Sequence, residues 1–313
     1  MFKNRWLPIG AAIALGFSLS FLGKHYAGPD RPGRVLPAAL EGGVVETPRR
    51  IVSFAPSITE TLFALGLGGR VAGDTRYCDY PPEAAAKPKV GGYLDPNYEA
   101  LLALHPDLVV LLQEQTESAR LLREMSIESL SVDHRNLEGI LDSIRRIGAA
   151  CGARDRAAEL LSDMRKRMDR IRERTAGLPR PAIMVTLGRN LASGDLKGTF
   201  ISGNDGYYND LIELAGGRNA YTGRTVSLPT VSPEGLHQLD PQVIVEMIPG
   251  LDTTRFDRQA FIRSWDFAAG VEAVSRGRIY VFTEEYVVRP GPRFILLAEQ
   301  LARVIHPEAD WES

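Results

Sequence analysis

Aromatic and polar side chains gather in four short segments that have neither helical nor strand periodicity. Tyrosine buries a large flat ring at low entropic cost and keeps a hydroxyl group for hydrogen bonding. Walls of this composition suit a flat ligand with polar edges, so these segments predict a binding site. The four segments are residues 76–82, 91–96, 202–208 and 284–289.

The sequence lacks the motifs of common catalytic sites. It contains no Gly-x-Ser-x-Gly elbow, no phosphate-binding loop ending in Lys-Ser or Lys-Thr, and no His-Glu-x-x-His motif. No two of its five histidines stand at helical ligand spacing. An exported metal-dependent enzyme that uses Cys78, Asp79 and His134 is a less favoured alternative. We therefore expect no enzymatic activity, no metal site and no cofactor.

The composition is that of an ordinary globular protein. Of the 313 residues, 44% are hydrophobic and 24% are charged, which excludes a disordered chain and a multi-span membrane protein. The 37 basic and 39 acidic residues give a net charge of −2, which argues against nucleic acid as a partner. Two cysteines, Cys78 and Cys151, are too few for a disulfide scaffold or a thiolate zinc site, and they leave one disulfide bond open.

The N-terminal segment has the order of charged and apolar residues that an export signal needs. Residues 1–5 form a short basic segment with Lys3 and Arg5, and residues 6–22 contain no charge. We expect residues 1–27 to be a signal peptide, or a signal anchor that stays in the membrane. Residues 28–48 are rich in glycine and proline and are predicted to be a linker. Because no cysteine lies near this segment, we expect an exported protein that is not a lipoprotein.

The binding loops must be positioned by strands and helices, which alternate in a first lobe over residues 49–153. Residues 108–112 form a continuous apolar run, as a strand covered on both faces requires. Alternation of this kind predicts a mainly parallel sheet in an α/β lobe. The predicted elements are strands over 51–54, 108–112 and 127–132 and helices over 59–66, 98–104 and 117–125.

A long helix leads to a second lobe. Between residues 154 and 175, apolar residues recur at helical spacing among many charges, with no glycine or proline. We expect a connecting helix over 154–177, a second α/β lobe over 178–307 and a tail over 308–313. The predicted elements of the second lobe are strands over 182–186, 243–247 and 279–282 and helices near 208–215 and 294–305.

A faint internal repeat relates the two lobes. Residues 99–110 match residues 234–245 at a constant offset of 135, and each copy predicts a short helix, a proline turn and a buried strand. A chance match between two common units is the alternative. Two similar lobes joined by one helix should leave a cleft, which is a usual site for a small ligand. We therefore predict two Rossmann-like α/β lobes joined by one long rigid helix.

Four motifs in this order resemble one family of binding proteins. They are residues 50–60, residues 77–84, residues 104–110 and the Pro-Arg pair at 292–293. They are similar to the periplasmic substrate-binding proteins of cobalamin, iron-siderophore and haem ABC importers, and most closely to the cobalamin-binding branch. The resemblance covers about residues 49 to 305 and implies a helical-backbone binding fold, a periplasmic location and a monomer that is not an enzyme.

The resemblance also implies ligand-binding residues in both lobes. An aromatic position of the cobalamin binders matches Tyr93, and an acidic-aromatic pair with an arginine matches Glu285, Tyr286 and Arg289. These side chains would contact a corrin ring and its substituents. The implied ligand is therefore cobalamin or a related corrinoid, held between the lobes.

Several positions depart from the cobalamin-binding pattern. Where that branch places tryptophans, this chain has Leu112 or Gln113 in the first lobe and Leu228 in the second. The disulfide positions of its best-known members correspond to Ala215 and Ala302, so that bridge is missing. A haem or a ferric siderophore would fit the same cleft.

In the haem case, the resemblance implies Tyr80, Tyr93 or Tyr286 as an iron ligand. The partner would be an ABC permease in the cytoplasmic membrane, to which each lobe of the family presents a surface glutamate. Glu117 and Glu234 best match those docking positions. A membrane-anchored sensor with the same fold is a further alternative.

Overall fold

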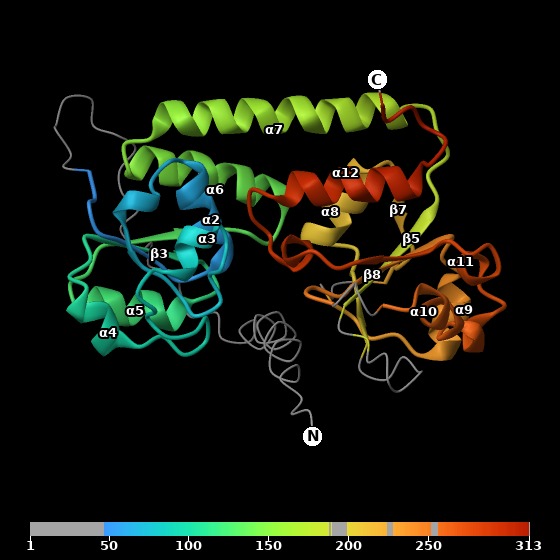
Figure 1. Cartoon of the computed structure of the whole chain (residues 1–313), viewed down its shortest axis with the longest axis horizontal. Helices are drawn as coiled ribbons and strands as arrows, with labels where there is room; N and C mark the ends of the chain where they lie inside the picture. Colours follow the sequence, from blue (N-terminus) through green and yellow to red (C-terminus); the bar gives the residue numbers. More distant parts are fainter. Residues whose placement is uncertain (1–46, 188, 190–198, 224–227, 252–255, 313) are drawn as a thin grey trace.

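A computed structural model describes residues 47–187, 189, 199–223, 228–251 and 256–312. It contains two α/β lobes side by side, with one long helix lying across both (Figure 1). The predicted export segment and almost all of the predicted linker lie outside the described residues. Among the helices that the structure describes, none is long and apolar enough to cross a membrane.

The first lobe is built on a four-stranded parallel sheet with the order β2-β1-β3-β4. Helices α2 and α6 cover the face toward the long helix, and α4 and α5 cover the other face (Figure 1). The strands are β1 (Ile51–Ser53), β2 (Val71–Gly73), β3 (Leu108–Leu112) and β4 (Ser129–Val132). The helices are α2 (Pro56–Ala64), α3 (Pro82–Ala85), α4 (Tyr98–Ala103), α5 (Thr116–Glu124) and α6 (Leu137–Ala150), with a 3₁₀ turn, η2 (Gly68–Arg70).

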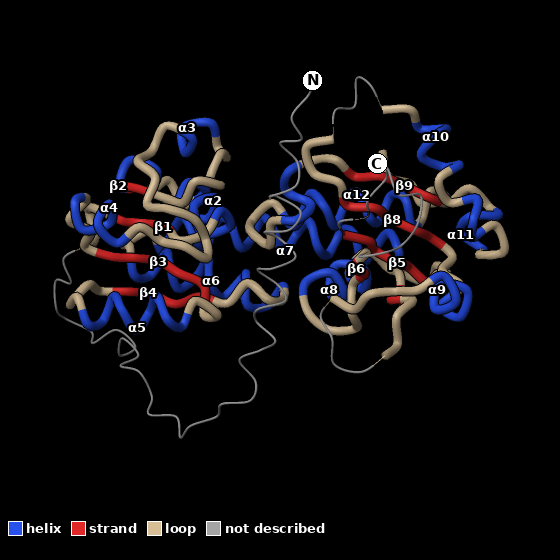
Figure 2. Tube along the Cα trace, turned by 90° about the horizontal axis from the view of Figure 1, so that it is seen from below, coloured by secondary structure: helices blue, strands red, loops and turns tan. Residues whose placement is uncertain are grey.

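The second lobe has a five-stranded sheet in which all pairs are parallel except the pair of β5 with β6. Figure 2 shows the two sheets next to each other, seen from the side away from the long helix. The strands are β5 (Ala182–Leu187), β6 (Phe200–Ile201), β7 (Arg218–Asn219), β8 (Val243–Met247) and β9 (Ile279–Phe282). The helical elements are α8 (Tyr207–Leu214), α9 (Pro233–Leu239), α10 (Arg258–Arg263), η3 (Asp266–Ala268), α11 (Glu272–Ser275), η4 (Glu285–Val288) and α12 (Phe294–Ile305).

Helix α7 (Arg154–Thr175) joins the lobes and packs on α6 in the first and on α12 in the second. It approaches α6 closely, because a Cβ atom on Gly148 would lie only 2.5 Å from the Cβ of Ala157. Arg167 donates two hydrogen bonds to Glu299 of α12, at 2.8 and 2.7 Å. The apolar face of α7 is buried in a hydrophobic core that runs through both lobes.

The two lobes use the same helix–turn–strand unit, as the internal repeat predicted. His105, after α4, and Asp240, after α9, are 135 positions apart and both adopt left-handed backbone, with φ of 43° and 38°. Two residues further on, the side chains of Asp107 and Gln242 accept backbone N–H bonds at the start of the first strand of their own lobes, at 2.9 and 3.0 Å. The repeat is therefore a shared turn geometry.

The alternation of strands and helices confirms the predicted α/β architecture, and β3, β8, β9 and α12 have the predicted bounds. Helix α2 begins at Pro56 and not at residue 59, and its N-cap, Ala55, makes no side-chain cap. The strand predicted over 127–132 begins at Ser129, because the Ile127 N–H bonds to Leu122 in the last turn of α5. Helix α6 was not predicted, although the Asn136 side chain caps it.

Candidate functional site

The two lobes meet at a group of charged side chains, which we call the interlobe ion cluster. Glu60 lies on α2 with only 3% of its surface exposed, and Asp79 lies in the loop before α3. Arg289 and Arg293 reach them from the segment that joins η4 to α12. Glu285, at the start of η4, lies 3.3 Å from Arg289 and completes the cluster.

Each arginine of the cluster binds a carboxyl group of the opposite lobe. Arg293 donates from Nε and Nη2 to the two oxygens of Glu60, at 2.8 and 2.5 Å. Arg289 donates to both oxygens of Asp79, one of them at 2.9 Å, and its Nη1 lies 3.7 Å from Glu60. Because bidentate pairs are geometrically specific, these contacts fix how the two lobes face each other.

Burial and pairing act in opposite directions on the carboxyl groups of the cluster. Burial raises the pKa of Glu60, against the lowering effect of Arg293 and Arg289. Burial would also raise the pKa of Asp79, but the hydrogen bonds and charge of Arg289 outweigh it, so this pKa lies below its usual value. The three carboxyl groups outnumber the two guanidinium groups, so the cluster has an acidic excess.

Two of the predicted ligand-binding tyrosines flank Arg293. Its guanidinium carbon lies 3.7 Å from the ring centroid of Tyr80 and 5.4 Å from that of Tyr286. Tyr80 is 44% exposed, and Tyr286 is half-buried. Burial raises the pKa of Tyr286 to about 12, so its hydroxyl group is neutral near pH 7. The two rings therefore offer flat surface and hydroxyl groups beside the ion cluster.

A second group of polar side chains lies where β3 ends. The Tyr93 hydroxyl group donates to Oε1 of Glu114 at 3.0 Å, and Gln115 donates to the Tyr93 carbonyl group at 2.9 Å. Gln113 is half-buried, and its backbone N–H bonds to the last residue of β4. Oε2 of Glu114 is buried and has no hydrogen-bond partner among the described residues, and burial raises the pKa of this carboxyl group.

The structure brings Tyr80, Glu285, Tyr286 and Arg289 together around the lobe junction. Leu228 is half-buried and packs against the same hydrophobic core as Tyr93 and Tyr286, and its role in ligand binding stays a prediction. Both groups follow strands, since Glu285 and Tyr286 come after β9 and Tyr93 lies near the end of β3. Ligands of open α/β sheets bind at the carboxyl ends of the strands, so this position supports the lobe junction as the candidate site.

Sequence reasoning missed three residues of the site. Glu60 and Arg293 stood inside motifs of the family resemblance but received no role. Glu114 was not singled out, although its position directly after a buried parallel strand was an available signal. For Glu60 and Arg293 the missing information was their pairing, which joins the two lobes.

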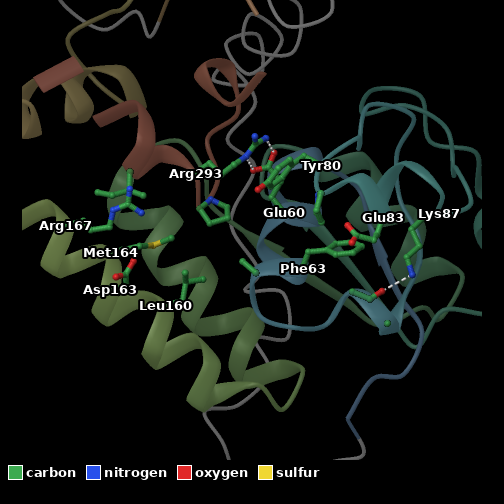
Figure 3. Close-up of a pocket in the computed structure, with 16 residues that line it drawn as sticks. Glu60, Phe63, Tyr80, Glu83, Lys87, Leu160, Asp163, Met164, Arg167 and Arg293 are labelled. Atoms are coloured by element: carbon green, nitrogen blue, oxygen red, sulfur yellow. Dashed lines mark hydrogen bonds and ion pairs between the residues drawn. The ribbon is translucent and has the colours of Figure 1, made fainter. Parts of the chain in front are cut away.

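A cavity of about 700 Å³ lies between α7, α2 and the start of α12. In Figure 3, Met164 of α7 lines one wall, Phe63 of α2 lies opposite, and Glu60, Tyr80 and Arg293 lie at one end. Of the predicted ligand-binding residues, only one tyrosine borders this cavity. The cavity therefore shares Glu60, Tyr80 and Arg293 with the candidate site, whereas Glu285, Tyr286 and Arg289 do not line it.

The predicted docking glutamates are both exposed and both occupy the second position of a helix. Glu117 of α5 accepts two hydrogen bonds from Arg120, at 2.9 and 2.6 Å, which lower its pKa. Hydrogen bonds from its own backbone N–H and from Ser232 lower the pKa of Glu234 of α9. In Figure 1, α5 and α9 both lie on the side of the molecule away from α7.

The residues considered for an enzyme have separate partners. Cys78 is buried against Thr59, and burial raises the pKa of its thiol to about 11. His134 is buried with Nδ1 at 2.9 Å from the Ser57 hydroxyl oxygen. Cys78 and Cys151 are both described and form no disulfide bond. Within the described ranges, no group of His, Cys, Asp and Glu side chains could hold a metal ion.

The sequence matches the family described as "Periplasmic binding protein" over residues 51–286, and the chain belongs to this family. Proteins of this family are substrate-binding transport proteins and not enzymes. Over 270 residues the chain is 28% identical to an uncharacterised ABC transporter substrate-binding lipoprotein, YvrC, of Bacillus subtilis, covering 85% of this chain and 82% of that protein. It is 27% identical to a vitamin B12-binding protein of Pectobacterium carotovorum, covering 81% and 87%.

Solved structures confirm the two-lobed fold. The periplasmic vitamin B12-binding protein BtuF of Vibrio cholerae superimposes with a TM-score of 0.69 at 24% identity, covering 83% of this chain and 97% of that one. A periplasmic haem-binding protein of Pseudomonas aeruginosa superimposes with a TM-score of 0.70 at 23% identity, covering 84% and 94%. At these identities the likeness establishes the fold, and the ligand must be argued from the site.

Proposed function

We propose that the protein is the substrate-binding component of an ABC importer and that it carries cobalamin or a related corrinoid between its lobes. The observation that carries this proposal is the meeting of Tyr80, Tyr286 and Arg289 at the lobe junction. The tyrosine rings supply flat surface for a macrocycle, and their hydroxyl groups and the neighbouring polar side chains can bind amide substituents at its edge. Tyr93 and Gln113, in the first lobe, would contact the same ligand.

The relatives support both parts of the proposal. Vitamin B12-binding proteins of several bacteria are 24–27% identical to the chain over most of its length. The name of YvrC supports a role in an ABC transporter. A delivery protein of this kind requires a permease in the cytoplasmic membrane and works as a periplasmic monomer.

Haem is the second candidate ligand, and one observation favours it. Tyr80 is 44% exposed at the lobe junction, and its phenol oxygen would be the iron ligand. Several structural neighbours are titled haem-binding proteins. A ferric siderophore would use the same junction.

Docking to the permease would use Glu117 and Glu234, which are exposed residues of α5 and α9, and both helices lie on the side of the molecule away from α7 (Figure 1). The protein would reach this partner after export, released by signal cleavage or held by residues 1–27. A lipid anchor, as the name of YvrC states for that protein, would need a cysteine after the export segment, and the two cysteines of this sequence are Cys78 and Cys151.

The test is a calorimetric titration of the protein with cyanocobalamin, haem and a ferric siderophore. We expect one site per chain with micromolar or tighter affinity for cyanocobalamin. Tyr286→Ala should weaken binding about tenfold, because it removes a ring that stacks on the ligand. The control, Tyr286→Phe, keeps the ring and should retain most of the affinity.

Haem or siderophore binding without cyanocobalamin binding would keep the transport role and overturn the corrinoid. An unchanged affinity in Tyr286→Ala would remove the lobe junction as the site. No binding of any of the three ligands would contradict the proposed function.

A further inference from the structure

Arg289 is occupied from several sides before any ligand arrives. Its side chain is only 12% exposed, whereas that of Asp79, which accepts two of its hydrogen bonds, is 55% exposed. Glu285 lies 3.3 Å from the same guanidinium group, and Glu60 lies 3.7 Å from it. Three carboxyl groups therefore surround the Arg289 cation. Asp79 is the most exposed of them, and it comes from the lobe opposite to Arg289.

This arrangement treats anionic and neutral ligand groups differently. A ligand carboxylate that approached Arg289 would have to displace Asp79 and would then lie close to Glu285 and Glu60. Like charges at such distances repel each other strongly where water is partly excluded. A neutral amide group meets no such repulsion, because it can donate to a carboxyl oxygen of Asp79 or Glu285 and leave the ion pair intact.

We propose that Asp79 is a specificity-determining residue, which makes the lobe junction reject anionic chelates and accept a neutral or cationic macrocyclic chelate. This inference rests on the proposed function and narrows its ligand class. Asp79 holds this role and Glu60 does not, because Glu60 is buried and both of its oxygens are bound by Arg293. Asp79 binds Arg289 across the junction from a half-exposed loop, where a ligand edge can reach it.

Two probes of nearly equal shape test the inference on the unmodified protein. They are cyanocobalamin and its monocarboxylic acids, in each of which one peripheral amide is hydrolysed to a carboxylate. We expect at least one monocarboxylic acid to bind about tenfold more weakly than cyanocobalamin at low salt. The difference should shrink in about 0.5 M NaCl, because salt screens the repulsion.

Asp79→Asn keeps the size of the side chain and removes its charge. In this variant we expect the ratio of the affinity for the affected monocarboxylic acid to the affinity for cyanocobalamin to rise about tenfold. Asp142→Asn is the control, because Asp142 is a carboxylate on α6 that pairs with Arg145 at 2.6 Å. This control should leave both affinities unchanged.

Equal affinities of the unmodified protein for both probes would overturn the inference and leave the proposed function intact. The same change for both probes in Asp79→Asn would also overturn it, since Asp79 would then act only on the lobe contact. If neither cyanocobalamin nor its monocarboxylic acids bind, the corrinoid part of the proposed function is itself overturned. The comparison of the two probes on the unmodified protein needs no variant, so the inference stays testable even if Asp79→Asn folds poorly.

Discussion

Glu60 illustrates how the fold keeps a charge almost fully buried. Removing a carboxylate from water costs several kcal/mol, and the cost is offset only by close partners with good geometry. Arg293 supplies two hydrogen bonds and Arg289 a second positive charge, and both come from the other lobe. The Glu60–Arg293 pair therefore forms only where the two lobes are in contact. Removing one partner should lower the free energy of unfolding more than removing both.

Arg293→Ala tests this dependence. We expect the free energy of unfolding in urea to fall by about 3 kcal/mol at pH 7.5, because Glu60 is left buried without its main partner. Without Arg293 the pKa of Glu60 rises further, so Glu60 protonates in the folded state as the pH falls and the loss becomes smaller. The double variant Glu60→Gln, Arg293→Ala should be more stable than Arg293→Ala. An equal loss at pH 5 and pH 7.5, or a double variant no better than the single one, would contradict this account.

The sequence could identify Tyr80, Tyr286 and Arg289 as candidates, because their types and their resemblance to known binders are local information. It could not identify their partners. Arg289 meets Asp79 across 210 residues of sequence, and Arg293 meets Glu60 across 233. No local period or motif spacing encodes a contact of that length, so the ion cluster emerges only when both lobes are folded.

Secondary structure elements were predictable where burial alone fixes them. Strands β3 and β8 are buried at every position, and a continuous apolar run defines β3 in the sequence. In β8 the run is interrupted by Glu246, which is buried in an ion pair with Arg189. The two-residue strands β6 and β7 have no such pattern, because their hydrogen bonds to β5 and not their own composition make them strands. Helix α6 had a clear signal, since apolar residues follow its Asn136 cap at helical spacing.

Helices α5 and α9 lie on the side of the molecule away from α7, and their second residues, Glu117 and Glu234, are exposed. This arrangement predicts the effect of charge reversal. Glu117→Arg with Glu234→Arg should abolish uptake of the ligand in cells that depend on this protein, because a permease that binds carboxylates would repel the new charges. The affinity of the purified protein for its ligand should stay the same. Glu159→Arg on α7 is the control and should transport normally. Normal uptake by the double variant would exclude these helices as the docking surface.

At the scale of the whole molecule, two separate connections hold the lobes together. One is the hydrophobic core that continues through α6, α7, α8 and α12. The other is direct contact, in which the Leu137 N–H bonds to Asp210 at 2.9 Å and a Cβ atom on Gly291 would lie 3.2 Å from the Cα of Ser57. Because the lobes are joined by the core and by direct contact, we expect acid to lower the stability of the protein through titratable groups buried at the lobe contact as well as through those buried in each lobe.

His134 is such a group, and it predicts the direction of the pH dependence. Burial holds its pKa at about 4, although the charge of Asp133 and the carbonyl group of Pro290 favour the protonated ring. In the unfolded chain its pKa is about 6.5, so between these values the unfolded state binds a proton that the folded state does not. Stability should therefore fall as the pH falls from about 6.5, with a loss from this residue of about 3 kcal/mol near pH 4. The free energy of unfolding in urea, measured at several pH values, should depend less on pH in His134→Gln than in the unmodified protein. His237→Gln, at an exposed position, is the control and should behave as the unmodified protein. Identical curves for all three proteins would mean that His134 does not set the acid response.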